Sequence, residues 1–234
     1  MVDRGAYSIP VVDNNKVSTH TFITNGFYIH SFEVCNKQWL EFIDYTGHSP
    51  PLCDVDLEDS YAYSQIFAWR GRSYAPGTGG LPVVFISVKD AEEFCAWRTR
   101  MTGVLHRLPT EDEWKVAAIA LDGRKYPWGD RIDGFVRLAN GRHIQVGPDP
   151  YYAQTDDVTC SGIKYMLGNV EEFTSTIRNG TRIICGSAYD VPVERAWLLK
   201  TTPAVPDVGG VYNVGFRYVI PLDDKGNPVP VHSE

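Results

Sequence analysis

The chain has 234 residues and a mass of 26.2 kDa, enough for one large or two small domains. Its net charge of −7, with no run of lysine or arginine, argues against nonspecific binding to nucleic acid or to an anionic membrane, since both need a basic surface. No stretch approaches the roughly 20 apolar residues of a membrane span, and the start lacks an apolar signal core, so we expect a cytoplasmic protein or one carried on a particle assembled inside a cell.

The residue composition also restricts the fold and the metal chemistry. With 21 glycines and 15 prolines, the sequence predicts short elements joined by many turns. The five cysteines show no CxxC spacing, which excludes the usual zinc sites and a complete disulfide framework. We expect mostly reduced thiols, with Cys95 as a small buried hydrophobic residue.

Alternating apolar and polar residues predict strands near the N-terminus: a short edge strand within 1–20, then strands at 21–24 and 26–29. Asp13, Asn14 and Asn15 indicate a turn.

Helical spacing of apolar residues follows and predicts a helix over 37–45 that stops at Gly47. Cys35 is a weak cap, so Asn36 is the better candidate for the N-cap.

Two capping boxes predict the starts of two further helices. Ser87 with Asp90 begins a helix that ends by Gly103, and Thr110 with Glu113 begins the next. Three acids in the first turn of the second helix are favoured there by the helix dipole.

Strands are predicted at 82–86 and 181–184. The apolar residues of 130–161 show no regular helical or strand spacing. Such a long irregular stretch needs packing of its aromatic residues or a bound ion to hold it in place.

Four segments carry a family resemblance: Arg107-Leu-Pro-Thr-Glu-Asp-Glu-Trp114, Tyr126-Pro-Trp-Gly-Asp130, Gly162 to Thr174 with its Gly-Asn-Val-Glu-Glu core, and Asn213-Val-Gly-Phe-Arg217. In this order they resemble the formylglycine-generating enzyme (sulfatase-modifying factor) family, whose closing strand matches residues 213–220. The resemblance implies a single domain over 1–234 with an α+β, C-type-lectin-like fold of short strands, two or three helices and long irregular loops.

The resemblance also shows which chemistry is missing. The family uses a pair of cysteines after Gly-Gly-Ser to hold copper, and those positions fall here on Asp190 and Arg195. Neither supplies the thiolate that Cu(I) prefers, so we expect no copper, no catalytic residue and no formylglycine generation. Cys185 is interpreted as a half-buried strand residue. Arg107 and Arg217 are expected to be structural, because an arginine fork can tie loop carbonyls or a carboxylate together.

Calcium is the cofactor that the resemblance leaves open. The family's Gly-Asn-Val-x-Glu loop supplies ligands that match Gly168, Val170 and Glu172, although Tyr165 replaces a preceding oxygen ligand. A second family site would use Asn140 and Gly141 with a later acid, which is Asp149, Asp156 or Asp157. The alternative is that Glu172 and Asn169 simply bond loop amides.

The segment 188–213 lies where the family places its active cleft, and it is rich in aromatic and aliphatic residues, which is typical of binding patches. Its Trp197 and Leu199 can alternatively pack inward. The candidate ligand-binding residues are Tyr189, Asp190, Val191, Val193, Glu194, Arg195, Trp197, Leu199, Thr201 and Tyr212.

This segment resembles a second branch of the fold, the variable proteins of diversity-generating retroelements of phages, archaeal viruses and bacteria. That branch displays a diversified ligand-binding surface at this place. It implies a non-catalytic protein, cytoplasmic or on a virus or phage particle, that binds a protein or another macromolecule, with no nucleic acid and no membrane insertion. The alternative is a divergent oxidoreductase or tailoring enzyme of the family, which requires groups such as Asp190, Glu194 and Arg195 to converge in a deep pocket.

Overall fold

The secondary structure mixes short strands with three helices in the part of the chain that is described. The computed structural model describes residues 1–13, 16–51, 69–119, 124, 126–130, 147–191, 201–203 and 210–231. The helices are α1 (Asn36–Thr46), α3 (Val88–Thr102) and α4 (Glu111–Ile119). The strands are β1 (Gly5–Asp13), β2 (Lys16–Thr24), β3 (Phe27–Ile29), β4 (Glu171–Arg178), β5 (Thr181–Cys185), β6 (Thr201–Pro203), β7 (Val214–Gly215) and β8 (Val219–Pro221).

Hydrogen bonds at the starts of α3 and α4 confirm both predicted capping boxes. The Ser87 hydroxyl accepts from the Asp90 amide at 3.2 Å, and the Asp90 carboxylate accepts from the Ser87 amide at 2.7 Å. Thr110 and Glu113 exchange the equivalent bonds at 3.1 and 2.8 Å. Because these caps satisfy amides that a helix start leaves unpaired, local chemistry fixes where both helices begin.

The N-cap of α1 is Cys35, which corrects the expectation that Asn36 caps this helix. The Gln38 side chain accepts from the Cys35 amide at 3.1 Å. Asn36 is the first helical residue, and its side chain donates to the Thr78 carbonyl at 3.0 Å and accepts from the Trp69 indole at 3.1 Å. Asn36 therefore ties a distant loop to α1 instead of capping it.

The strands form three small sheets. β1 and β2, of nine residues each, make an antiparallel hairpin that is longer than the predicted edge strand, and β3 pairs with β8. The third sheet has the order β6-β5-β4-β7, in which β4 and β7 are parallel. β4 is absent from the sequence predictions. The predicted strand at 82–86 does not form: Pro82 makes one isolated bridge with Cys35, and Phe85 has a left-handed backbone with φ of 58°.

The predicted closing strand at 213–220 is split between two sheets. β7 pairs with β4, and a few residues later β8 pairs with β3. Arg217 lies in the crossing between them and is 0% exposed. Arg217 is therefore buried at the point where the chain passes from one sheet to the other.

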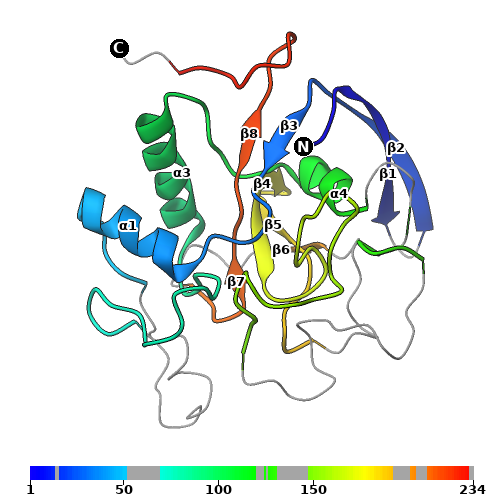
Figure 1. Ribbon diagram of the computed structural model, residues 1–234. Coiled ribbons are helices and arrows are strands. Elements are labelled where there is room, and N and C mark those ends of the chain that lie inside the picture. The colour runs from blue at the N-terminus through cyan, green and yellow to red at the C-terminus, as the bar shows by residue number, and fades with distance from the viewer. Residues whose placement is uncertain are drawn as a thin grey trace.

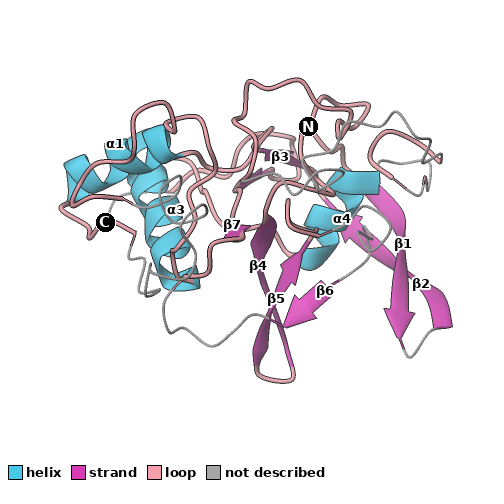
Figure 2. Ribbon diagram, turned by 90° about the horizontal axis from the view of Figure 1, so that it is seen from below, coloured by secondary structure: helices cyan, strands magenta, loops and turns pink. Residues whose placement is uncertain are grey.

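The helices pack on opposite sides of the central strands. Figures 1 and 2 both place α1 and α3 on one side and α4 with the β1–β2 hairpin on the other. The first side has an aromatic core in which Trp39 stacks on Phe94 at 5.7 Å, with Cys95 buried beside it as predicted. The second core is built around Trp114. No helix in the described ranges is long and apolar enough to cross a membrane.

Candidate functional site

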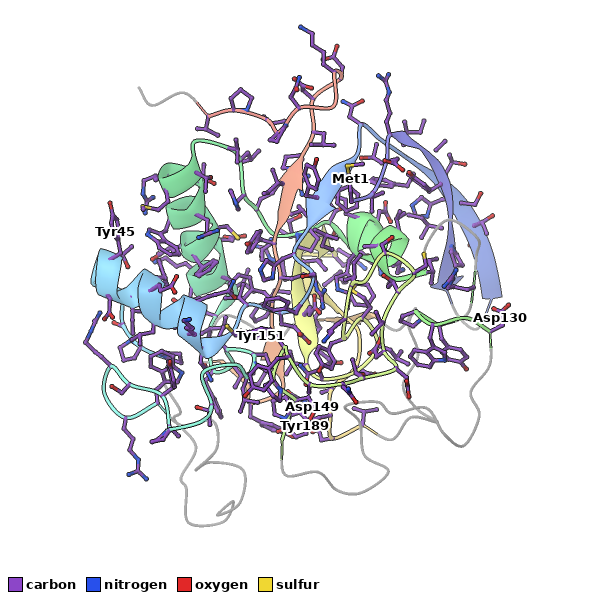
Figure 3. The ribbon with its side chains drawn as sticks, in the orientation of Figure 1. Met1, Tyr45, Asp130, Asp149, Tyr151 and Tyr189 are labelled. Carbon is purple, nitrogen blue, oxygen red and sulfur yellow. The ribbon has the colours of Figure 1, made fainter. Side chains whose placement is uncertain are left out.

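Asn169 holds two loops together at one end of the molecule. It is 0% exposed and has a left-handed backbone with φ of 72°. Its side-chain oxygen accepts from the Asp149 amide, and its main-chain oxygen accepts from the Tyr189 amide, both at 2.8 Å. Its side-chain NH₂ donates to Glu33 at 3.1 Å. Figure 3 shows Asp149, Tyr151 and Tyr189 gathered at this end. The expectation that Asn169 bonds a loop amide is confirmed.

Tyr189 packs beneath the two loops that Asn169 connects. Its ring is 1% exposed and packs in a buried cluster with Leu81, Val84, Phe85 and Val170. The cluster anchors the turn that follows β5, so Tyr189 is a packing residue and not an exposed ligand contact.

Asp190 and Tyr212, both predicted as binding residues, meet at the surface. The Tyr212 hydroxyl donates to the Asp190 carboxylate at 2.8 Å, and the Tyr212 side chain is 37% exposed. The Tyr212 ring also lies edge-to-face with Tyr189, at 6.3 Å between centroids. A charged acceptor and an exposed aromatic ring therefore stand together on a packed base.

The other predicted binding residues are only partly described. Val191 is half-buried, and its amide donates to the Ala188 carbonyl at 3.0 Å. Thr201 is described only as main chain of β6. Outside the described residues lie Val193, Glu194, Arg195, Trp197 and Leu199, together with Asn140 and Gly141.

A buried ion pair lies behind this surface. Arg217 donates to both carboxylate oxygens of Glu172 at 2.7 Å, and both side chains are 0% exposed. Trp114 donates its indole N–H to the same carboxylate at 2.9 Å. Arg217 also donates to the carbonyls of His30, Lys164 and Tyr165. These contacts confirm the expected structural role of Arg217. The Glu172 carboxylate, for which loop amides were the alternative partners, accepts from Arg217 and Trp114.

Two further buried acids, Glu33 and Asp157, interact electrostatically with Arg217. Burial raises the pKa of Glu33 well above its ordinary value, against the lowering effect of Arg217. Burial also raises the pKa of Asp157 to about 6, although the Gly168 and Leu167 amides lower it. One guanidinium therefore faces three carboxyl groups, and Glu33 holds its proton to a higher pH than an exposed glutamate does.

The two expected calcium loops differ in how well they fit a cation. At the first loop, of Gly168, Val170 and Glu172, the Glu172 carboxylate is already bonded by Arg217 and Trp114. At the second, Asp157 is 0% exposed and one oxygen accepts from the Leu167 and Gly168 amides at 2.9 and 2.7 Å.

The other Asp157 oxygen, Oδ1, is buried without a hydrogen-bond partner in the described structure. In the described ranges, no group of three or more His, Cys, Asp and Glu side chains is arranged to hold a metal ion. The second loop thus offers an oxygen that suits a hard cation, whereas an ion at the first would compete with Arg217.

The described thiols form no disulfide. The four described cysteines, Cys35, Cys95, Cys160 and Cys185, are free. Cys185 is fully buried at the end of β5, deeper than predicted, and burial raises its pKa well above the ordinary thiol value. Cys185 is therefore a structural strand residue, while the first position where the family has a copper thiolate is the exposed Asp190.

Sequence comparison places these features in a family. The family described as sulfatase-modifying factor enzyme 1-like domain matches residues 1–222. A Bos taurus protein named inactive C-alpha-formylglycine-generating enzyme 2 is 44% identical over 125 residues, which cover 46% of this chain and 38% of that protein. The chain thus corresponds to well under half the length of this relative.

Solved structures share the fold. PvdO from Pseudomonas aeruginosa has a TM-score of 0.73 at 18% identity, covering 94% of this chain and 92% of its own. Treponema denticola variable protein 1 has a TM-score of 0.67 at 15% identity, covering 93% and 92%. At these identities the likeness shows the fold alone, and it confirms the predicted α+β fold of the C-type-lectin-like type.

Proposed function

We propose that this chain, which belongs to the family of sulfatase-modifying factor enzyme 1-like domains, binds a macromolecular ligand through the surface around 188–213 and does not generate formylglycine. The observation that carries the proposal is the contact of Asp190 with Tyr212 at 2.8 Å. A carboxylate stands where the family resemblance requires the first copper thiolate, and it is bonded to a surface phenol. Carboxylate oxygen is a hard ligand, whereas Cu(I) selects soft sulfur.

The base under this surface also supports a binding role. Asn169 bonds the main chain of both loops, and Tyr189 is packed beneath them. Preformed surfaces lose less conformational freedom on association, so more of the contact energy contributes to affinity.

The test of the catalytic part is a direct assay. The purified chain is incubated with a cysteine-containing sulfatase peptide, copper and oxygen, and the peptide is analysed by mass spectrometry beside a formylglycine-generating enzyme as the positive control. We expect formylglycine only in the control. Formylglycine made by this chain would overturn the proposal.

The test of the variable surface is to read the DNA that flanks the gene. We expect a reverse transcriptase gene and a near-repeat of the codons for about residues 186–217 that differs only at adenines. A flanking cluster of oxidase or tailoring genes without such a repeat would instead favour the divergent enzyme.

We also propose that Ca²⁺ binds beside Asp157, with Asn140 and Gly141 as the further ligands that the family resemblance implies. The buried Oδ1 of Asp157, which has no partner in the described structure, supports this site. The ion would tie the long irregular stretch to the loop at Leu167 and Gly168 and so stiffen the scaffold.

A further inference from the structure

Three exposed tyrosines lie at the end of the molecule that carries Asp190. Tyr151, Tyr152 and Tyr212 are 37%, 63% and 37% exposed. Tyr151 and Tyr152 follow Asp149, in the loop that Asn169 holds, and so lie outside the segment 188–213. The exposed aromatic surface is therefore larger than the sequence indicates.

Packing joins the two loops into one surface. A Cβ placed on Gly80 would lie 2.6 Å from the Tyr152 ring, so this ring packs directly on the Gly80 backbone. The next residue, Leu81, belongs to the buried cluster of Tyr189. Tyr189 in turn meets the Tyr212 ring at 6.3 Å. A continuous series of contacts thus runs from Tyr152 to Tyr212.

A row of aromatic neighbours holds the rings of Tyr151 and Tyr152. Tyr151 stacks on Phe32 at 4.6 Å with an interplanar angle of 17°, and Tyr152 lies edge-to-face with Tyr151 at 5.2 Å. Phe32 packs on His30 at 4.4 Å, and His30 packs on Tyr218 at 4.6 Å. Because this row fixes the ring positions, the two tyrosines lose little freedom when a ligand binds.

The described part of this region carries a negative charge. The described stretches 149–156, 187–191 and 210–213 contain three aspartates, Asp149, Asp156 and Asp190, and no lysine, arginine or histidine. Lys164 is a neighbouring cation, and its ammonium donates to the carbonyls of Tyr151 and Ala153 at 3.1 and 3.0 Å. The whole chain carries −7, which adds to the attraction for a cationic ligand.

We propose that this tyrosine–aspartate surface, formed by Tyr151, Tyr152, Tyr212 and Asp190, binds a polypeptide segment rich in arginine or lysine. Tyrosine faces attract cations through their negative π clouds, and an exposed carboxylate forms charge-assisted hydrogen bonds with a guanidinium. The inference rests on the proposed binding function and names the chemistry of its partner.

The experiment uses the full chain and a synthetic peptide of alternating arginine and serine, with a peptide of alternating glutamate and serine as the probe of opposite charge. Affinity is measured by fluorescence anisotropy at two salt concentrations for Tyr152→Ala and Asp190→Asn. The matched controls are Tyr45→Ala and Asp44→Asn on α1, where the Tyr45 residue is 67% exposed and the Asp44 side chain 60% exposed. Figure 3 shows Tyr45 far from Tyr151 and Tyr189.

We expect Tyr152→Ala and Asp190→Asn each to weaken arginine-peptide binding roughly fivefold or more, because a cation–π contact or a charged hydrogen bond contributes about 1 kcal/mol. The α1 variants should bind as the wild type does. Gly80→Ala, which retains every binding group but displaces the Tyr152 ring, should also weaken binding.

Equal losses in Asp190→Asn and Asp44→Asn would overturn the inference, because they would indicate attraction by the net charge alone. Failure of the wild type to bind the arginine peptide would overturn it too, as would Tyr152-dependent binding of a neutral oligosaccharide instead. The formylglycine assay tests the proposed function separately. If the chain makes no formylglycine and also does not bind the arginine peptide, only the proposed arginine- or lysine-rich partner is rejected.

Discussion

Glu172 and Arg217 form a two-point salt bridge from which solvent is excluded, with both N–O distances at 2.7 Å and both side chains 0% exposed. The acid lies on β4 and the arginine in the crossing between β7 and β8. Trp114 on α4 donates to the same carboxylate at 2.9 Å. One ion pair therefore connects two sheets and a helix behind the proposed binding surface.

The first prediction concerns this pair. Arg217→Met leaves Glu172 buried without its cation, and breaking a buried pair costs about 3–5 kcal/mol. The variant should unfold at a markedly lower urea concentration. Adding Glu172→Leu removes the uncompensated acid and should recover part of the loss, but not all, because the Trp114 indole then lacks its acceptor. An Arg217→Met midpoint equal to that of the wild type would contradict a stabilising role.

The second prediction is that stability falls with rising pH because of Glu33. Burial raises the pKa of Glu33 well above its ordinary 4.5, so the folded chain keeps a proton that the unfolded chain releases. The free energy of unfolding therefore decreases as pH rises from about 4.5 towards the folded pKa. Glu33→Gln cannot titrate but can still accept from Asn169, so its stability should change less with pH.

Two other buried groups also change the stability with pH. Burial lowers the pKa of His30 from 6.5 to about 4, which removes stability as pH falls through that range. Asp157, with a pKa raised to about 6, acts in the opposite direction between about 4 and 6. Both proteins contain these groups, so the difference between their stabilities in urea denaturation, measured from about pH 4.5 upwards, reports Glu33. Parallel curves there would count against a protonated Glu33.

Local chemistry made the helix boundaries predictable, because the donors and acceptors of a cap lie within one turn. Ser87 with Asp90 and Thr110 with Glu113 bond as expected. The prediction that Asn36 caps α1 was wrong because the partners of its side chain, Thr78 and Trp69, come from a loop much later in the chain.

The strand β4 and most of the buried charge could not be predicted from local patterns. β4 opens with two glutamates, and Glu172 is tolerated inside only because Arg217, 45 positions away, neutralises it. Glu33 depends on Asn169, which lies 136 positions away. Asp190 and Tyr212 were predicted as site residues, whereas Tyr152 lies in a stretch without periodicity.

The third prediction tests Asn169 as the residue that holds the two loops. Asn169→Gly keeps the left-handed backbone, which glycine adopts freely, but removes the side-chain bonds to Asp149 and Glu33. Hydrogen exchange should accelerate at the Asp149 amide. Exchange at the Tyr189 amide, which bonds the Asn169 main chain, is the internal control and should change little. Equal acceleration at both amides would indicate general unfolding instead of a released loop.

The fourth prediction is that calcium raises the melting temperature through Asp157. A ligand that binds only the folded chain stabilises it in proportion to the logarithm of its concentration. Wild type should melt higher in calcium than in chelator, whereas Asp157→Asn should melt at one temperature in both, because the amide lacks the charge that holds the ion. In chelator the variant should be at least as stable as wild type near neutral pH, since burial raises the pKa of Asp157 and the folded chain therefore favours an uncharged side chain there. Glu172→Gln, which alters the other loop, is the matched comparison, and loss of the calcium response there but not in Asp157→Asn would move the ion to the Glu172 loop.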